Sequence, residues 1–543
     1  MTTTVAAAGP RTFVLAIVSL VGGLITALAF PPTGWAPLIV VGPALGLWAW
    51  SHAPAARTGA MLGLLYGWSF SFLAFRWMLE VDVVAGIVLP TVQGCFWAAT
   101  AAVSAATTRL RPGWWVATAA ATWTLAEVAR AHVPLTGFEW GQLSMATADA
   151  PVRSATAIVG ALGLTAALAA LAAGLAAAAR WRGTRRSALP VLIVVLLLGA
   201  TVGLGLVRWT TPDAPLAVTV IQVDDPCPDV FAQDCPGYSI ELLRSYIAGA
   251  RQVARPPDLM VWGEDALLGA DTLEQVGADL ARQAGELPAP LLAGVGTPTA
   301  PGRFLRWAAL YDADGVPLDG YAKRMPVPFG EYVPARDLLG AISDVGRLVP
   351  NDLQAGTDTS PVVLPTDAGT ARLGTVVSWE VTFSRAVRAV AREANGLATL
   401  TTVASYGTSA ASDQLLDAAQ LRAVEHQKPM VVAATTGRSA LIGPNGDIEA
   451  SSALFRADQL SGSLALRSGL TPYARFGDLP VVLSAAALVV AGWFRRRRMT
   501  PDGPRRAISE AVSDAPTLTR SRVDGARRPR WISSCAMPHA PVI

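Results

Sequence analysis

The chain has 543 residues, of which 52% are hydrophobic and 15% are charged, whereas about 25% of residues are charged in an average soluble domain. The net charge of +3 is too small to indicate a nucleic-acid-binding protein, and the four cysteines and four histidines show no spacing typical of a metal site. Long apolar runs fill the first 210 residues, while the middle of the chain has an ordinary globular composition. We therefore expect a membrane protein that uses no metal or other cofactor.

Eight apolar runs are long enough to cross a bilayer, which takes about 20 residues. Seven of them lie at 12–30, 34–51, 57–78, 83–106, 114–131, 154–178 and 188–207, and the eighth lies at 479–494. The segment Ala27-Leu28-Ala29 resembles a signal-peptide cleavage site, but further runs follow at once, so we favour a retained first helix. We predict a membrane domain of seven transmembrane helices over 1–210 and an eighth helix over 476–496.

Arginine positions indicate the orientation of these helices, because cytoplasmic loops carry an excess of positive charge. With a cytoplasmic N-terminus, the inner segments contain Arg57, Arg109, Arg111, Arg180, Arg182, Arg185, Arg186 and the arginine run 495–498. Residues 208–477 then lie on the outer face of a bacterial plasma membrane. The tail 497–543 is basic and polar without an apolar period, which predicts a disordered segment on the cytoplasmic side.

Tryptophans near the outer ends of the helices allow two interpretations. Aromatic residues at a membrane interface are usually belt anchors, and this is the default for Trp77, Trp140 and Trp209. The alternative is that the long outer loop 131–153, which holds Trp140, helps to form an entry for lipid.

Residues 211–475 alternate β-rich runs with amphipathic patterns, which predicts an α/β domain. The expected strands cover 216–223, 259–262, 290–295, 307–311, 361–364, 373–377, 398–403, 430–435 and 440–442. The expected helices cover about 239–253, 272–284, 383–394 and 413–426. Turn signals at Asp312-Ala-Asp-Gly315 and Pro444-Asn-Gly446 predict hairpins, so some strands should be antiparallel.

Cys227 and Cys235 lie close together in this domain, outside the membrane. That compartment permits a disulfide, which we favour over two free thiols. Neither cysteine follows an expected strand, so neither is a candidate nucleophile.

Three polar residues of the α/β domain lie where apolar strands are expected to end. Glu264 follows Val261-Trp-Gly, Lys323 precedes a proline-rich loop, and Ser378 follows the run 373–377. Singly, they could be a helix cap, a surface charge and a small strand-end residue. Together, a carboxylate, an ammonium group and a nucleophile are the groups that acyl transfer needs as base, oxyanion stabiliser and acylated group.

At these motifs the chain resembles the apolipoprotein N-acyltransferase family, over about residues 11–495. The most specific match is Tyr321-Ala-Lys-Arg-Met-Pro-Val-Pro-Phe-Gly-Glu-Tyr-Val-Pro334, and other matches are Trp262-Gly-Glu264, Val377-Ser-Trp-Glu380, Arg422-Ala-Val-Glu425 and Thr435-Thr-Gly437. The resemblance implies a nitrilase-like αββα sandwich inserted in a bundle of about eight membrane helices. It also implies transfer of an acyl chain from a phospholipid to the enzyme, and then to the N-terminal amine of a diacylglyceryl-cysteine lipoprotein.

The resemblance also implies roles for single residues. Glu264 would be the general base, Lys323 would stabilise the oxyanion, and Ser378 stands at the position of the nucleophile. The supporting residues would be the carboxylates Glu331 and Glu380 and the aromatic Trp379.

Two features depart from the family's pattern. The family nucleophile is a cysteine, whose thiol has an ordinary pKa of about 8.5. The hydroxyl of Ser378 instead needs a well-placed base throughout its attack. Residues 403–412 are small and polar where the family has Asn-x-x-Trp-Phe, and active-site loops carry substrate contacts.

One hypothesis is therefore an active N-acyltransferase with a serine nucleophile, favoured by the retained carboxylates and lysine. The alternative is a catalytically impaired relative that binds lipid, or that acts as a scaffold for another envelope enzyme such as a polyprenol-phosphate mannosyltransferase.

Overall fold

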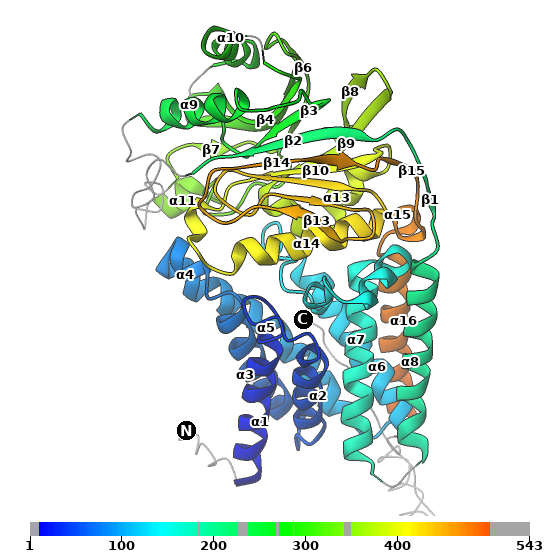
Figure 1. The fold of residues 1–543 in the computed structure, drawn as a ribbon. Helices are drawn as coiled ribbons and strands as arrows, with labels where there is room; N and C mark the ends of the chain where they lie inside the picture. Colours follow the sequence, from blue (N-terminus) through cyan, green and yellow to red (C-terminus); the bar gives the residue numbers. More distant parts are fainter. Residues whose placement is uncertain are drawn as a thin grey trace, which may run out of the picture. The chain divides into compact units, whose positions relative to one another are not determined.

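The computed structural model describes residues 10–182, 185–224, 237–267, 271–285, 287–340 and 349–499. Every predicted apolar run coincides with a helix (Figure 1): α1 (Pro10–Ala27), α2 (Leu38–Ser51), α3 (Ala56–Ala74), α5 (Val83–Ala106), α6 (Pro112–Arg130), α7 (Thr156–Arg180), α8 (Arg185–Gly205) and α16 (Leu479–Met499). The short α4 (Met78–Val81) precedes α5. Among the described residues, four helical segments are long and apolar enough to cross a membrane: Val83–Ala106, Pro151–Arg180, Ala188–Gly205 and Leu479–Arg498. The count of eight spans stays a prediction.

Small residues let α3 and α5 approach each other closely. A Cβ atom at Gly63 would lie 2.3 Å from the carbonyl oxygen of Trp97, and one at Gly67 would lie 2.2 Å from that of Gly94. No side chain fits at such distances, so glycine is required at both positions of α3. Close packing of this kind is how helices associate in a lipid environment.

Within the described part of the chain, the α/β region contains two large sheets and one small one. The seven-stranded sheet has the order β14-β2-β3-β4-β5-β6, with β7 beside β5, and the six-stranded sheet has the order β13-β12-β11-β10-β9-β8. Their strands are β2 (Leu216–Gln222), β3 (Leu259–Trp262), β4 (Leu291–Ala300), β5 (Arg303–Tyr311), β6 (Pro317–Ala322), β7 (Asp352–Leu353), β8 (Val362–Thr366), β9 (Gly369–Val377), β10 (Gly396–Thr401), β11 (Met430–Ala434), β12 (Ala440–Ile442), β13 (Ile448–Ser451) and β14 (Asp458–Leu464). The small sheet pairs β1 (Thr210–Pro212) with β15 (Arg467–Gly469).

Alternating side chains of β3 show how these sheets form layers. Leu259 and Val261 belong to the core shared with the six-stranded sheet, whereas Met260 and Trp262 pack against α9 (Tyr238–Ala250) and α10 (Leu273–Ala284). The other sheet is covered by α13 (Ser384–Ala391) and α14 (Ala411–His426) (Figure 1). Two short helices complete the region: α11 (Arg336–Gly340) follows β6 in the chain, and α15 (Pro472–Phe476) follows β15. The period of two along a strand thus places one sheet face against helices and the other against the second sheet.

The predicted elements of the α/β region are largely confirmed. All nine expected strands and all four expected helices are present, with ends shifted by a few residues. Both hairpin predictions are correct, because β5 pairs with β6 and β12 pairs with β13 in antiparallel fashion. The strands β1, β6, β7, β13, β14 and β15 were not expected from the sequence. The cysteines Cys227 and Cys235 and the tail from residue 500 onward lie outside the described residues.

Two tryptophans predicted as belt anchors instead join the helical part to α14. Trp77 and Trp140 are only 2% and 1% exposed, and their indole N–H groups donate to the same oxygen of Gln414, Oε1, at 3.2 and 2.8 Å. Their rings lie 4.6 Å apart, centre to centre. The belt prediction is therefore wrong for this pair, whereas Trp209 is 40% exposed and remains compatible with it.

Candidate active site

Glu264 lies two residues beyond β3, in a place where the two large sheets come together. A Cβ atom at Gly263 would lie 2.4 Å from the backbone nitrogen of Thr435, so only glycine allows this approach. The Thr435 hydroxyl donates to the Glu264 carbonyl oxygen at 2.6 Å, and the backbone N–H of Thr402 donates to Glu264 Oε2 at 3.0 Å. The side chain is buried, and burial raises the pKa of this carboxyl above its ordinary value.

Lys323 follows β6 directly and is completely buried. Its Nζ lies 3.3 Å from Glu264 Oε1 and 2.6 Å from Glu331 Oε1. Burial alone would lower the pKa of this lysine, but the two carboxylates outweigh it and the pKa is raised. Lys323 is therefore a fixed ammonium group between two acids.

Glu331 closes the proline-rich loop that begins at Lys323. Its Oε2 accepts a hydrogen bond from the Val327 backbone N–H at 2.8 Å. Burial opposes ionisation of Glu331, but the charges of Lys323 and Arg306 prevail, and its pKa lies below the ordinary value. The loop bends at Phe329, whose φ of +63° lies in the left-handed region. The structure thus brings Glu331 into the same cluster as Glu264 and Lys323, as the sequence predicts.

Arg306 on β5 is a fourth member of the cluster, and sequence reasoning missed it. Its Nη1 contacts Glu264 Oε1 at 3.1 Å and also Glu331 Oε1, and its Nε forms an ion pair with Asp265 Oδ1 at 2.9 Å. A signal for Arg306 was present, because it is a charged residue within the apolar run Phe304-Leu-Arg-Trp-Ala-Ala-Leu310. A charge in a buried strand requires a partner.

Ser378 lies at the first position after β9, with a φ of +58°. The left-handed region is strained for a residue with a Cβ, and strain of this kind often marks functional positions. The side chain is buried, with 7% of the residue exposed. Within the described part of the chain, no hydrogen bond joins Ser378 to Glu264 or Lys323.

Glu380 ties the end of β9 to the loop after Lys323. Its Oε2 accepts from the Val377 backbone N–H at 2.8 Å, and its Oε1 accepts from the backbone N–H groups of Arg324 and Met325 at 2.9 Å each. The hydroxyl of Tyr321 adds a fourth hydrogen bond, at 3.1 Å. The predicted supporting carboxylate therefore acts through position, because it clamps the segments on which Ser378 and Lys323 lie.

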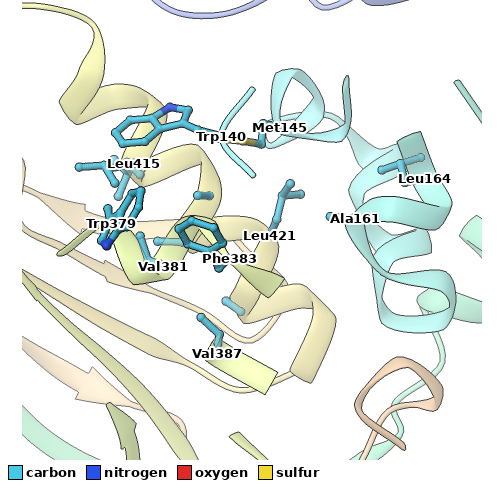
Figure 2. Packing of buried hydrophobic residues seen from close by; sticks show 14 of the residues in the cluster. Trp140, Met145, Ala161, Leu164, Trp379, Val381, Phe383, Val387, Leu415 and Leu421 are labelled. Carbon is cyan, nitrogen blue, oxygen red and sulfur yellow. The ribbon is translucent and has the colours of Figure 1, made fainter. Parts of the chain in front are cut away.

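Trp379 packs beneath this clamp. Its indole N–H donates to the Met325 carbonyl oxygen, and its ring meets that of Phe383 edge-on with centres 4.9 Å apart. Figure 2 shows Trp379, Val381 and Phe383 among the buried side chains of this core. The aromatic residue predicted for the site thus links the segment after Ser378 to the loop after Lys323.

The loop 403–412 contains one aromatic residue, Tyr406, whose contacts were not expected from the small and polar character of the loop. Tyr406 packs edge-on against Trp77, with ring centres 5.1 Å apart, and lies 6.5 Å from the ring of Trp140. Burial raises the pKa of its phenol, and the charges of Glu264 and Glu331 raise it further. Tyr406 therefore contacts both tryptophans of the helical part and lies near enough to the two carboxylates to be affected by their charge.

The Arg422-Ala-Val-Glu425 motif has a structural place on α14. Arg422 Nη1 lies 2.7 Å from Glu425 Oε2, and both side chains are buried. Glu425 Oε1 accepts from the backbone N–H of Ala161 at 2.7 Å, next to Gly160, whose φ of +69° interrupts the helical geometry of α7. The motif therefore anchors the α/β region to the kink of a membrane helix.

Among the described residues, no group of three or more histidine, cysteine, aspartate or glutamate side chains could hold a metal ion. The cluster consists of carboxylates paired with Lys323 and Arg306.

Two family models match the chain. Residues 22–175 match the apolipoprotein N-acyltransferase N-terminal domain, and residues 237–464 match the carbon-nitrogen hydrolase model. The second match covers the strands that carry Glu264, Lys323 and Ser378.

Curated relatives extend these matches over most of the chain. The apolipoprotein N-acyltransferase of Chromobacterium violaceum is 33% identical over 397 residues, which are 71% of this chain and 74% of that protein. The protein of the same name from Methylococcus capsulatus is 27% identical over 507 residues, 89% of this chain and 96% of that one.

Among solved structures, a mutant of the amidase from Nesterenkonia sp. AN1 covers 51% of this chain and 98% of its own, with 18% identity and a TM-score of 0.33. The fold assignment rests on the carbon-nitrogen hydrolase model rather than on that superposition. The matched models and the 33% identity together show that this chain belongs to the apolipoprotein N-acyltransferase family.

Proposed function

We propose that this protein is an apolipoprotein N-acyltransferase of a bacterial membrane, which moves a fatty acyl chain from a phospholipid to the N-terminal amine of a diacylglyceryl-cysteine lipoprotein. The main support is the fully buried ammonium of Lys323, held between Glu264 and Glu331. Burying such a group costs free energy even when it is paired, and clusters of this kind gather at functional sites. The names of the curated relatives point to the same activity.

In the first step, Ser378 Oγ attacks the carbonyl carbon of a phospholipid ester while Glu264 takes the hydroxyl proton. The new bond joins Oγ to the carbonyl carbon, and the Lys323 ammonium stabilises the oxyanion. The ester C–O bond then breaks, and the lysophospholipid oxygen leaves with the proton from Glu264. The product is an acyl ester on Ser378.

In the second step, the amine of the lipoprotein attacks this ester. Glu264 takes a proton from the amine, the C–N bond of the amide forms, and the bond to Ser378 Oγ breaks. The serine oxygen recovers its proton from Glu264, which restores the starting state. The three supporting residues take no proton in this scheme. The contacts of Glu331, Glu380 and Trp379 hold Lys323 and the end of β9 in place.

The serine nucleophile makes the first step demanding. A hydroxyl gives up its proton far less readily than a thiol, so Glu264 must lie within hydrogen-bond reach of Ser378 Oγ during the attack. Catalytic hydrogen bonds often tighten only when substrate binds. We therefore expect slow acylation by the native chain and faster acylation by Ser378→Cys.

We also propose that α1, α2, α3, α5, α6, α7, α8 and α16 all span the membrane, with a cytoplasmic N-terminus and the α/β domain 211–475 on the outer face. Two features support this placement. The inner ends of the helices carry the arginines, as expected for cytoplasmic loops. Leu192, Leu196 and Leu197 on α8 are exposed apolar side chains that lipid would cover.

The test is an acylation assay with purified protein, phospholipid vesicles and a diacylated lipopeptide, followed by mass spectrometry of the lipopeptide. The native chain, Ser378→Cys and Ser378→Ala are compared. Triacylated product from the first two and none from Ser378→Ala supports the proposal. If the first two are inert in matched, folded preparations, the proposal fails and the alternative of a lipid-binding scaffold for another envelope enzyme is favoured.

A further inference from the structure

Arg306 touches both carboxylates that Lys323 touches, and on the same oxygens. Arg306 Nη1 lies 3.1 Å from Glu264 Oε1, and Lys323 Nζ lies 3.3 Å from the same oxygen. Both cations also contact Glu331 Oε1. The four groups therefore form a closed ring in which two positive charges alternate with two negative ones.

Asp265 extends this ring toward solvent. Its Oδ1 lies 2.9 Å from Arg306 Nε, and its side chain is 23% exposed, against 1% for Glu264 and 15% for Arg306. The arginine fork thus links a buried acid to a partly solvated one. Because an arginine remains charged under all ordinary conditions, its effect on Glu264 is permanent.

The contacts of Glu264 leave its carboxylate little freedom. Oε1 is held by the two cations, and Oε2 is held by the Thr402 backbone N–H at 3.0 Å. Lys323 alone is a point charge on a flexible stem, whereas a planar guanidinium defines direction as well as charge. Arg306 therefore contributes an orientation that Lys323 does not supply.

We propose that Arg306 is a positioning residue, which holds the Glu264 carboxylate in the place and charge state that a general base needs, and that Asp265 opposes it. The inference rests on the proposed function, in which Glu264 is that base.

The electrostatics of Glu264 agree with this role. Burial raises the pKa of the carboxyl, Lys323 and Arg306 lower it, and Asp265 and Glu331 raise it again. Removing the Arg306 charge should therefore raise the pKa of Glu264, and removing the Asp265 charge should lower it. A variant that merely loosened the fold would not give shifts of opposite sign.

The experiment uses the full chain with Ser378→Cys, so that a readout exists without acyl transfer. The rate at which iodoacetamide alkylates the thiol introduced at position 378 is followed against pH by peptide-resolved mass spectrometry. With Arg306→Gln, the rise of this rate should move to higher pH by about one unit, because Glu264 loses one of the two cations that favour its ionised form. With Asp265→Asn it should move to lower pH. Arg306→Lys keeps the charge but not the planar guanidinium, so it should restore the pH of the rise, and the exposed Arg303→Gln on the same strand should leave the parent profile unchanged.

The inference fails if the profiles of Arg306→Gln and Asp265→Asn coincide with the parent profile, or if both move in the same direction. If Arg306→Gln does not fold, the inference is still tested by two variants. The profile of Asp265→Asn should move to lower pH, and that of Arg306→Lys should rise at the same pH as the parent. Acyl transfer is assayed on the same proteins. Shifted profiles without acyl transfer would count against the proposed function alone, and acyl transfer with unshifted profiles would count against the role of Arg306 alone.

Discussion

The ammonium of Lys323 and the carboxylate of Glu331 meet at 2.6 Å across a loop in which they are eight residues apart. Glu331 also accepts the backbone N–H of Val327 within that loop. Because Lys323 is completely buried, opening the loop would remove the nearer of its two carboxylate partners and leave only Glu264 beside a buried charge. The shape of the proline-rich loop and the position of Lys323, the cation proposed to stabilise the oxyanion, therefore depend on the same contact.

Replacing Lys323 by methionine should damage both stability and acyl transfer. The substitution leaves Glu264 and Glu331 buried with one cation fewer, and breaking a buried ion pair typically costs about 3–5 kcal/mol. Acylation should fall by about 100-fold or more, because the oxyanion loses its cation. Unfolding in detergent and the acylation assay measure the two effects.

The matched control is Lys428→Met. Lys428 is also buried and donates to the carbonyl oxygen of Ala391, but it takes no part in the ion pairs of the site. This variant should lose stability and keep acyl transfer wherever it is folded. Equal activity losses in the two variants would argue against a chemical role for Lys323.

The buried carboxyl group of Glu425 on α14 leads to a prediction about how the free energy of unfolding depends on pH. Burial raises the pKa of Glu425 from 4.5 to about 8, against the opposing effects of Arg422 and of the Ala161 N–H. Between these values the unfolded chain has released the proton and the folded chain still holds it, so the free energy of unfolding must decrease as pH rises. One proton gives a slope of at most about 1.4 kcal/mol per pH unit.

Glu425→Gln removes the titrating group and keeps an oxygen that can accept the Ala161 N–H. The stability of the native chain relative to this variant should therefore decline between about pH 5 and about pH 8. Denaturant unfolding in detergent at several pH values gives the difference. A constant difference would mean that Glu425 is ionised throughout this range.

The contact between the helical part and α14 can be tested at Gln414. Its Oε1 is the acceptor for the indoles of both Trp77 and Trp140. Gln414→Leu would leave two buried donors unpaired, at about 1–3 kcal/mol each. We expect the free energy of unfolding to fall by about 2 kcal/mol or more. The control Gln459→Leu, at an exposed position of β14, should change the free energy of unfolding by less than about 0.5 kcal/mol. Similar losses in both variants would contradict the role of Gln414 in joining the helical part to α14.

Most of the fold could be predicted because its strands are buried and apolar. The run 259–262 was placed correctly, since four consecutive apolar residues between loop signals indicate a strand inside a sheet. The strands β13 and β14 were missed because their side chains are mostly polar and exposed. The strand β6 was missed because Asp319 and Gly320 interrupt its apolar pattern.

The candidate site was only partly predictable. Glu264 and Lys323 follow strands that end at the same place, so their contact follows from the pattern and the family motif. Arg306 lies 42 residues from Glu264 and 25 from Glu331 in sequence, and local patterns carry no signal about which strand pairs beside which. The burial of Trp77 and Trp140 was likewise hidden, because it depends on α14, a helix more than 270 residues away in sequence.

The most direct test of the proposed chemistry is the mass of the protein itself after incubation with phospholipid vesicles in the absence of acceptor. We predict an added acyl group at position 378 in the native chain, a larger fraction in Ser378→Cys, and none in Ser378→Ala or in Ser378→Cys combined with Glu264→Gln. An unmodified native chain together with an unmodified Ser378→Cys, both folded, would contradict the claim that this strand end carries the nucleophile of an acyltransferase.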